Sequence, residues 1–168
     1  MVWVHNPIFR DRDEEAAAYA AVGKLAVGWG PVEMTIENLL VLMLNRQRAP
    51  TQGGAFVGFP VSYTKKRDQL KDALRDDPAV ADIRAVVGPL LTEATAIHKF
   101  RIIAVHGFCQ GTTAEGDLMY GVSDQKTGFA YRPHTLRMTD IRRHGDRLPV
   151  LHSELGEAHS ALRDRKRL

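Results

Sequence analysis

The run from about Leu90 to Cys109 limits what this chain can fold into more than any other part of the sequence. Its late half is apolar on nearly every side of a helix, through Ile97, Phe100, Ile102, Ile103, Ala104, Val105 and Phe108. A helix with apolar residues on all faces is buried at the centre of a bundle, because no side of it favours contact with water. The sequence therefore predicts an all-α fold, a helical bundle built around this helix.

Helical periodicity before and after this run supplies the other helices. Apolar residues recur at three-, four- and seven-residue steps in a first helix from about Asp13 and in a final helix from about Asp140. A shorter helix is expected over residues 62–75, with Ser62 or Thr64 as its N-terminal cap. These helices account for most of the chain.

Prolines fall inside three of the helical patterns. A proline lacks the N–H that a helix interior needs, and its ring displaces the carbonyl four residues earlier. We therefore expect a kink or short break near Pro31 and a division of the central stretch at Gly88–Pro89. Pro149 should kink the last helix or delay its start. The bundle then has four to five helices.

Two segments are expected to be non-helical. Residues 48–60 hold three glycines and two prolines, which predicts a loop. Residues 118–123 and 129–132 have strand character and flank the turn-forming sequence at 125–128. A small β-hairpin is therefore expected before the last helix.

Bulk composition narrows the class of protein. The 168 residues fit a single domain over the whole chain, and the 44% hydrophobic and 26% charged fractions are ordinary for a globular protein. The only cysteine is Cys109, which favours a reducing compartment, and the first residues lack the features of a secretion signal. Residues 25–44 have membrane-spanning length but include Glu33 and Glu37, each costing roughly 2.5–3.5 kcal/mol in lipid. We expect a cytoplasmic protein with no membrane partner.

The charge gives a mild bias toward anionic partners. The net charge is +3, and basic residues gather at 65–67, 142–143 and 163–167. Lys65, Lys66 and Lys99 are candidate contacts for nucleic-acid phosphates. The alternative interpretation of such clusters is that they are solvated helix faces.

Two residues of the apolar helix, Arg101 and His106, need an explanation. A buried guanidinium must be paired or must border a wet cleft. Glu33 lies on the same helical face as Trp29 and Ile36, which predicts an interior carboxylate that meets Arg101 or His106. Five residues separate Arg101 from His106, about 140° around a helix, so the two do not stack on one face.

The segment from Arg101 to Gly107 resembles the Arg-x(4–6)-His motif of HEPN domains. The layout also resembles that family from about Asp13 to Leu162, with Trp29-x-x-x-Glu33 in the first helix and a glycine after the motif. HEPN domains are small helical bundles that typically dimerise and often act as metal-independent endoribonucleases. The family pattern usually has a polar residue after the arginine, where this chain has Ile102.

The resemblance implies RNA binding, with metal-independent endoribonuclease activity as the candidate reaction. Arg101 would stabilise charge on the phosphate and His106 would act as general acid or base, with Glu33 as an orienting partner. It also implies a homodimer with a composite site, a toxin-like or defence-like setting, an antitoxin protein as candidate partner, and no cofactor. The alternative is a non-catalytic interaction or dimerisation module in which Arg101 is a structural partner of Glu33.

Other chemistries have weaker support. His144, His152 and His159 recur along one face of the last helix near Glu157, an arrangement that sometimes holds a metal ion. We expect no metal site there, because histidines at such spacings are common on exposed helices. Cys109 is expected to be a small buried residue and not a nucleophile. No Walker-type phosphate loop, dinucleotide fingerprint or serine-hydrolase elbow occurs in the sequence.

Overall fold

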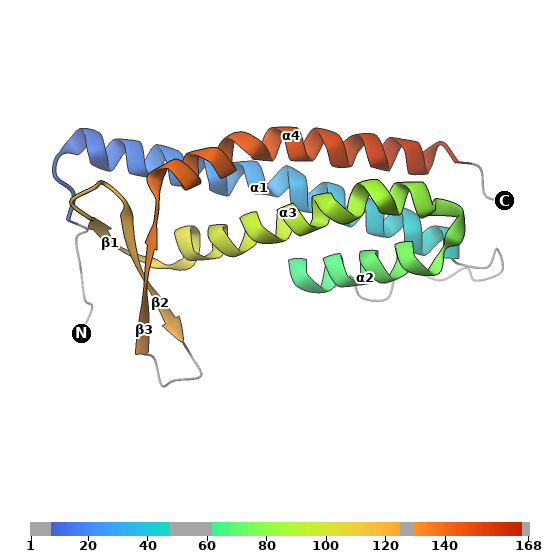
Figure 1. The fold of residues 1–168 in the computed structure, drawn as a ribbon, viewed down its shortest axis with the longest axis horizontal. Coiled ribbons are helices and arrows are strands. Elements are labelled where there is room, and N and C mark those ends of the chain that lie inside the picture. The colour runs from blue at the N-terminus through green and yellow to red at the C-terminus, as the bar shows by residue number, and fades with distance from the viewer. Residues whose placement is uncertain (1–7, 48–61, 125–129, 166–168) are drawn as a thin grey trace. The chain divides into compact units, whose positions relative to one another are not determined.

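A computed structural model describes residues 8–47, 62–124 and 130–165 (Figure 1). Along these residues the elements run in the order α1 (Arg12–Gln47), α2 (Tyr63–Asp76), η1 (Pro78–Val80), α3 (Ala81–His106), β1 (Phe108–Thr112), β2 (Leu118–Asp124), β3 (Ala130–Leu136) and α4 (Met138–Arg163). The fold is mainly α with one small antiparallel sheet, as expected. The predicted loop at 48–60 and the turn at 125–128 lie outside the described residues.

The chain divides into two compact units. One holds residues 1–29 and 96–148, and the other holds residues 30–95 and 149–168. We call them the sheet unit and the α2 unit, after the element that each contains alone. The helices α1, α3 and α4 each contribute residues to both units. A single domain over the whole chain stays a prediction.

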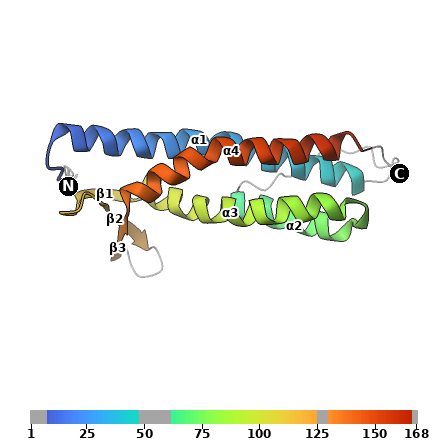
Figure 2. The ribbon, with the colours of Figure 1, turned by 45° about the horizontal axis from the view of Figure 1, so that its top comes forward.

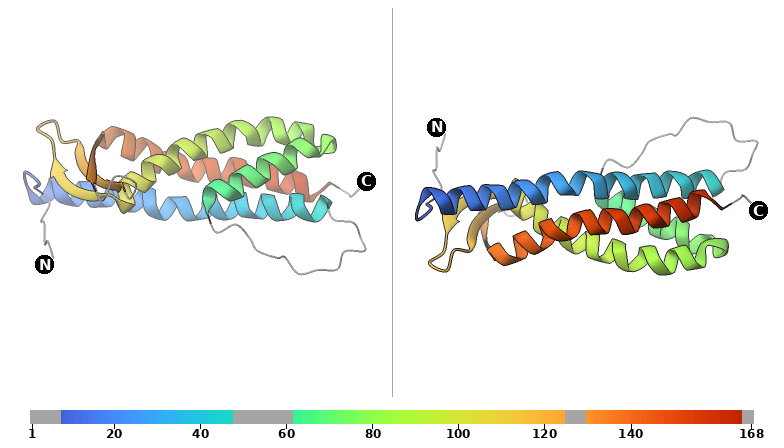
Figure 3. Two further views of the ribbon diagram at one scale, coloured as in Figure 1. Left: turned by 90° about the horizontal axis from the view of Figure 1, so that it is seen from below. Right: turned by 90° about the horizontal axis from the view of Figure 1, so that it is seen from above.

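Local signals set the helix ends around α2. The Ser62 hydroxyl accepts a hydrogen bond from the Lys65 N–H, which caps α2 and confirms the predicted start. The Asp77 side chain accepts from the Ala79 N–H, and Pro78 occupies the first position of η1, where its missing N–H costs nothing. In the α2 unit, α2 then lies beside the second half of α1 (Figure 3).

The prolines do not break the helices, which corrects the expected divisions. Pro31, Pro89 and Pro149 all lie inside continuous helices, and α4 begins at Met138 with no delay. All three occupy exposed positions. The carbonyls that Pro31 and Pro89 leave without a helical donor belong to Val27 and Ala85, which are exposed, so water can bind them. Val27, which precedes Pro31 by four residues, is 78% exposed.

The sheet unit contains three strands where two were expected. They pair in the order β1-β2-β3, all antiparallel, and β3 leads directly into α4 (Figure 2). The expected helix through Cys109 was wrong at its end: α3 stops at His106 and Cys109 belongs to β1. Large buried side chains of this unit are Leu25, Trp29, Ile97, Leu118, Ile141 and Leu148.

A backbone bridge attaches the segment before α1 to β1. The Ile8 N–H donates to the Gln110 carbonyl at 3.1 Å, and the Thr112 N–H donates to the Ile8 carbonyl at 3.0 Å. Gly111 lies between them with φ of 124°, and a Cβ there would come within 2.1 Å of the Ile8 oxygen. Glycine is therefore required both by the backbone conformation and by the close approach.

The buried residues of the α2 unit follow helical stripes on all of its helices. They include Val32, Ile36, Leu39, Leu40, Met43, Leu70, Leu74, Val80, Val87, Leu91, Leu151, Leu155 and Leu162. By length and composition α1 also passes as a membrane-spanning helix, with an 18-residue window of mean hydropathy 1.2. Core helices of soluble proteins and signal sequences pass the same test, and 39% of that window is buried inside the structure.

Glu14 connects α1 to the segment on both sides of the bridge. Its contacts lead us to expect that the free energy of unfolding decreases in acid. Hydrogen bonds from the Arg10 side chain and N–H lower the Glu14 pKa from 4.5 to about 2, and the Thr112 hydroxyl also donates to this carboxylate. The folded pKa is below the unfolded one. The contribution of Glu14 is therefore complete above about pH 4.5 and is lost as the pH falls toward about 2.

The free energy of unfolding, measured by urea titration between about pH 6 and pH 2, tests this assignment. Glu14→Gln should be less stable than the wild type at about pH 6, and the difference should shrink through the acid range. Asp13→Asn removes an exposed carboxylate from the same turn of α1 and serves as the matched control. A wild-type advantage that stayed constant down to about pH 2 would contradict the role of Glu14.

Candidate functional site

Two ring contacts fix the rotation of α3 where it carries the motif. The His98 ring packs on Trp29 of α1, with 5.0 Å between ring centroids, and Trp29 is only 1% exposed. The Phe100 ring meets His144 of α4 edge-on, with centroids 4.8 Å apart. Because these contacts hold α3 from two directions, the side on which each neighbouring residue lies is also determined.

Arg101 lies on the inward side of α3. It follows Ile97 by four residues and precedes Ala104 by three, and these two are 1% and 5% exposed. Residues at these spacings share a helical face. Arg101 is half-buried, and its Nε is buried without a hydrogen-bond partner among residues 8–47, 62–124 and 130–165. The guanidinium therefore has unsatisfied hydrogen-bonding capacity.

His106 lies on the outward side of the same helix. It is exposed, and so is Lys99, seven residues earlier; Ile102 between them is 38% exposed. We call these three residues the outward face. Lys99 and His106 were predicted separately as site residues, and their seven-residue spacing places them on a shared helical face.

The outward face corrects one expectation about the apolar helix. Ile102 and Phe108 are 38% and 39% exposed, so the late part of the run is not buried on every side. The opposite placement of Arg101 and His106 agrees with their 140° separation. Within one copy of the chain, therefore, Arg101 and His106 do not form a site together on one face of α3.

The helix α3 ends at His106, and the next position is a glycine because no larger residue fits there. Its N–H donates to the Ile103 carbonyl at 2.9 Å. A Cβ at this position would lie 2.3 Å from that oxygen and 3.1 Å from the Tyr120 ring. The missing side chain thus allows the chain to turn from α3 into β1 directly against β2.

Glu33 is engaged by a lysine. Lys66 Nζ donates to Glu33 Oε1 at 3.2 Å and to Glu37 Oε2 at 2.7 Å, and Lys66 is 9% exposed. Burial lowers the Lys66 pKa, but the hydrogen bonds from Lys66 to Glu37 and Glu33 outweigh it, and the pKa is raised. The expected contact of Glu33 with Arg101 or His106 stays a prediction.

The two lysines proposed as phosphate contacts at the start of α2 differ in their exposure to solvent. Lys65 is exposed, whereas Lys66 is buried between two carboxylates. Lys66 therefore forms ion pairs inside this fold, and its contact with a nucleic acid stays a prediction. Beside it the Tyr63 hydroxyl lies 3.1 Å from Thr95 Oγ1, and burial raises the Tyr63 pKa.

The alternative chemistries find little geometric support. Within the described ranges no three His, Cys, Asp or Glu side chains gather as metal ligands, and His144 packs on Phe100. Cys109 lines a cavity of about 110 Å³ together with Tyr19 and Tyr120. Burial raises the Cys109 pKa, which leaves less of the thiolate that a nucleophile requires.

Lys66 and Lys65 form a matched pair for testing the buried ion pairs. Lys66→Met keeps the apolar stem and removes the charge between Glu33 and Glu37, so it should lower the free energy of unfolding by about 1.5–3 kcal/mol. Lys65→Met should change it by less than about 0.5 kcal/mol. Urea denaturation of both variants provides the measurement. Equal effects would show that Lys66 is not a structural residue.

Gly107 and Gly156 should respond oppositely to alanine. Gly107→Ala forces a Cβ against the Ile103 oxygen and should cost about 1–3 kcal/mol. Gly156→Ala adds a methyl group with nothing within 4 Å in the interior of α4, and should stabilise by about 0.5–1 kcal/mol. Thermal melts of the two variants compare them directly. A neutral Gly107→Ala would refute the tight exit.

Comparison of the chain with models of protein families, with curated proteins and with solved structures gave no match. The resemblance to HEPN domains therefore rests on the sequence features from Arg101 to Gly107 and on the order of the helices. It is carried forward as a proposal about function.

Proposed function

We propose that the chain binds RNA, with the guanidinium of Arg101 as a phosphate contact. The observation that carries this proposal is the buried Nε of Arg101, which has no partner in the described part of the chain. An unsatisfied cation on the inward side of a helix costs free energy unless an anion completes it. Phosphate suits a guanidinium especially well, because two parallel hydrogen bonds form at once.

Exposed cations elsewhere on the sheet unit, including Lys99 of the outward face, are available to an extended anion. Lys99 and Arg142 are exposed, and neither forms an ion pair within the described residues of the sheet unit. Several phosphates at regular spacing would use such scattered cations, and a single small anion would not. The chain's net charge of +3 acts in the same direction.

Cleavage is part of this proposal and requires His106. A base would take the proton of an RNA 2′-hydroxyl while its oxygen attacks the adjacent phosphorus, and an acid would protonate the departing 5′-oxygen. Arg101 and His106 point to opposite sides of α3, so the catalytic pair is assigned across a homodimer, as the HEPN resemblance implies. The cytoplasmic location and the toxin-like or defence-like setting with an antitoxin belong to the same proposal.

Arg101→Met separates binding from structure. The Arg101 Nε has no partner among the described residues, so removing this cation from its half-buried site should leave stability equal to the wild type or raise it by about 1 kcal/mol. RNA affinity should fall about tenfold, because a charge-assisted hydrogen bond is lost. The measurements are fluorescence anisotropy on a mixed RNA pool at two salt concentrations and urea denaturation. A variant that is destabilised but still binds RNA would make Arg101 a structural residue.

Cleavage is tested in EDTA on the same RNA pool. His106→Ala should bind RNA but lose cutting, while His152→Ala, at an exposed histidine of α4, is the matched control. Arg84→Met, at an exposed arginine of α3 in the α2 unit, is the matched control for Arg101→Met. Binding without cutting by the wild type would leave an RNA-binding protein. If the wild type neither binds nor cuts RNA, the proposed function is refuted.

A further inference from the structure

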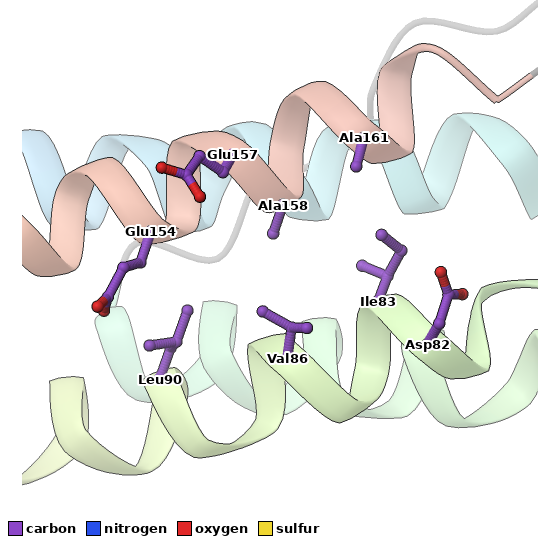
Figure 4. A pocket seen from close by; sticks show the side chains of 8 residues that line it. All are labelled: Asp82, Ile83, Val86, Leu90, Glu154, Glu157, Ala158 and Ala161. Carbon is purple, nitrogen blue, oxygen red and sulfur yellow. The ribbon is translucent and has the colours of Figure 1, made fainter.

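A groove runs between α3 and α4 in the α2 unit. Figure 4 shows Ile83, Val86 and Leu90 of α3 facing Ala158 and Ala161 of α4, with the two helices antiparallel. The groove has a volume of about 570 Å³. It combines large apolar side chains on one wall with alanines on the other, and the small alanines leave the space unfilled.

The apolar wall of the groove is open to solvent. Ile83 and Ala158 are each 5% exposed and form the floor, but Val86 is 54% exposed. The stripe that packs α3 into its own unit runs through Val87 and Leu91, which are both fully buried. Val86 and Leu90 precede these residues by one position each, and they form a second apolar stripe beside the first.

The rim of the groove is acidic. Asp82, Glu154 and Glu157 line it, and Asp82 pairs with Arg165. Glu157 is exposed and makes no ion pair with any residue that the structure describes. This local negative charge stands out on a chain whose net charge is +3.

We propose that this groove binds an amphipathic, basic helix of a partner protein. Val86 and Leu90 on α3, with Ala158 and Ala161 on α4, offer side chains at helical spacing to a third helix lying between them. Lysine or arginine residues flanking the partner's apolar stripe would meet the carboxylates of the rim. The apolar contacts supply affinity, and the rim supplies selectivity.

Other occupants fit the groove less well. The acidic rim repels the phosphates of RNA. A small-molecule pocket usually presents a few converging hydrogen-bonding groups among its apolar residues. The lining residues here are apolar or acidic, with no hydroxyl or amide side chain among them. The inference is independent of the RNA proposal, which concerns residues of the sheet unit.

A displayed library of helical 18-residue peptides, selected on the full-length chain, tests the proposal. Enriched peptides should carry apolar residues at three- and four-residue steps and a positive net charge. Their affinity should fall about tenfold for Val86→Gln, since one exposed valine would otherwise be buried in the complex. Val150→Gln is the matched control, because Val150 is 49% exposed on α4 and does not line the groove.

Glu157→Lys adds an independent check on charge. This substitution should weaken the binding of basic peptides, and the loss of affinity should diminish as the salt concentration is raised. Circular dichroism must first show that each variant keeps the wild-type helix content. Enrichment of acidic peptides, equal effects of Val86→Gln and Val150→Gln, or no enriched peptide would overturn the proposal. So would sedimentation showing that Val86→Gln dissociates a homodimer, because a second copy would then occupy the groove.

Discussion

The rotation of α3, set by the Trp29–His98 and Phe100–His144 contacts, determines what the sheet unit presents to its surroundings. A helix held on two sides by rings has little freedom to turn about its axis. Arg101 consequently lies inward, with an unsatisfied Nε, and His106 lies outward. The chemistry proposed for this chain follows from that division, since it separates the phosphate-binding group from the proton-transfer group.

Periodicity predicted the helices well, because burial of an apolar stripe is a local property that three- and four-residue steps report directly. The extra strand β1 was missed. Apolar character continues from α3 through Phe108 and Cys109, and only Gly107 marks the change. The helix breaks predicted at the prolines were wrong. Sequence alone does not show that Pro31, Pro89 and Pro149 would all face solvent inside continuous helices.

The candidate site was less predictable than the fold. Arg101 and His106 were found from residue type and spacing, but their partners depend on contacts between distant segments. Lys66 is an example. It lies on the buried stripe of α2 with Leu70 and Ala73, and this spacing indicates burial, but a charged side chain is ordinarily expected at the surface. The two carboxylates that meet it are roughly thirty residues away in the chain, and no local pattern pairs them.

The bridge between Ile8 and Gly111 implies very different tolerance to substitution at its two ends. Ile8 is held through its own N–H and carbonyl, and its side chain is 71% exposed. Almost any residue except proline can make those bonds, so position 8 is able to drift over evolutionary time. Position 111 is restricted to glycine by backbone geometry and by crowding. Among descendants of this sequence, an invariant glycine would face a variable partner.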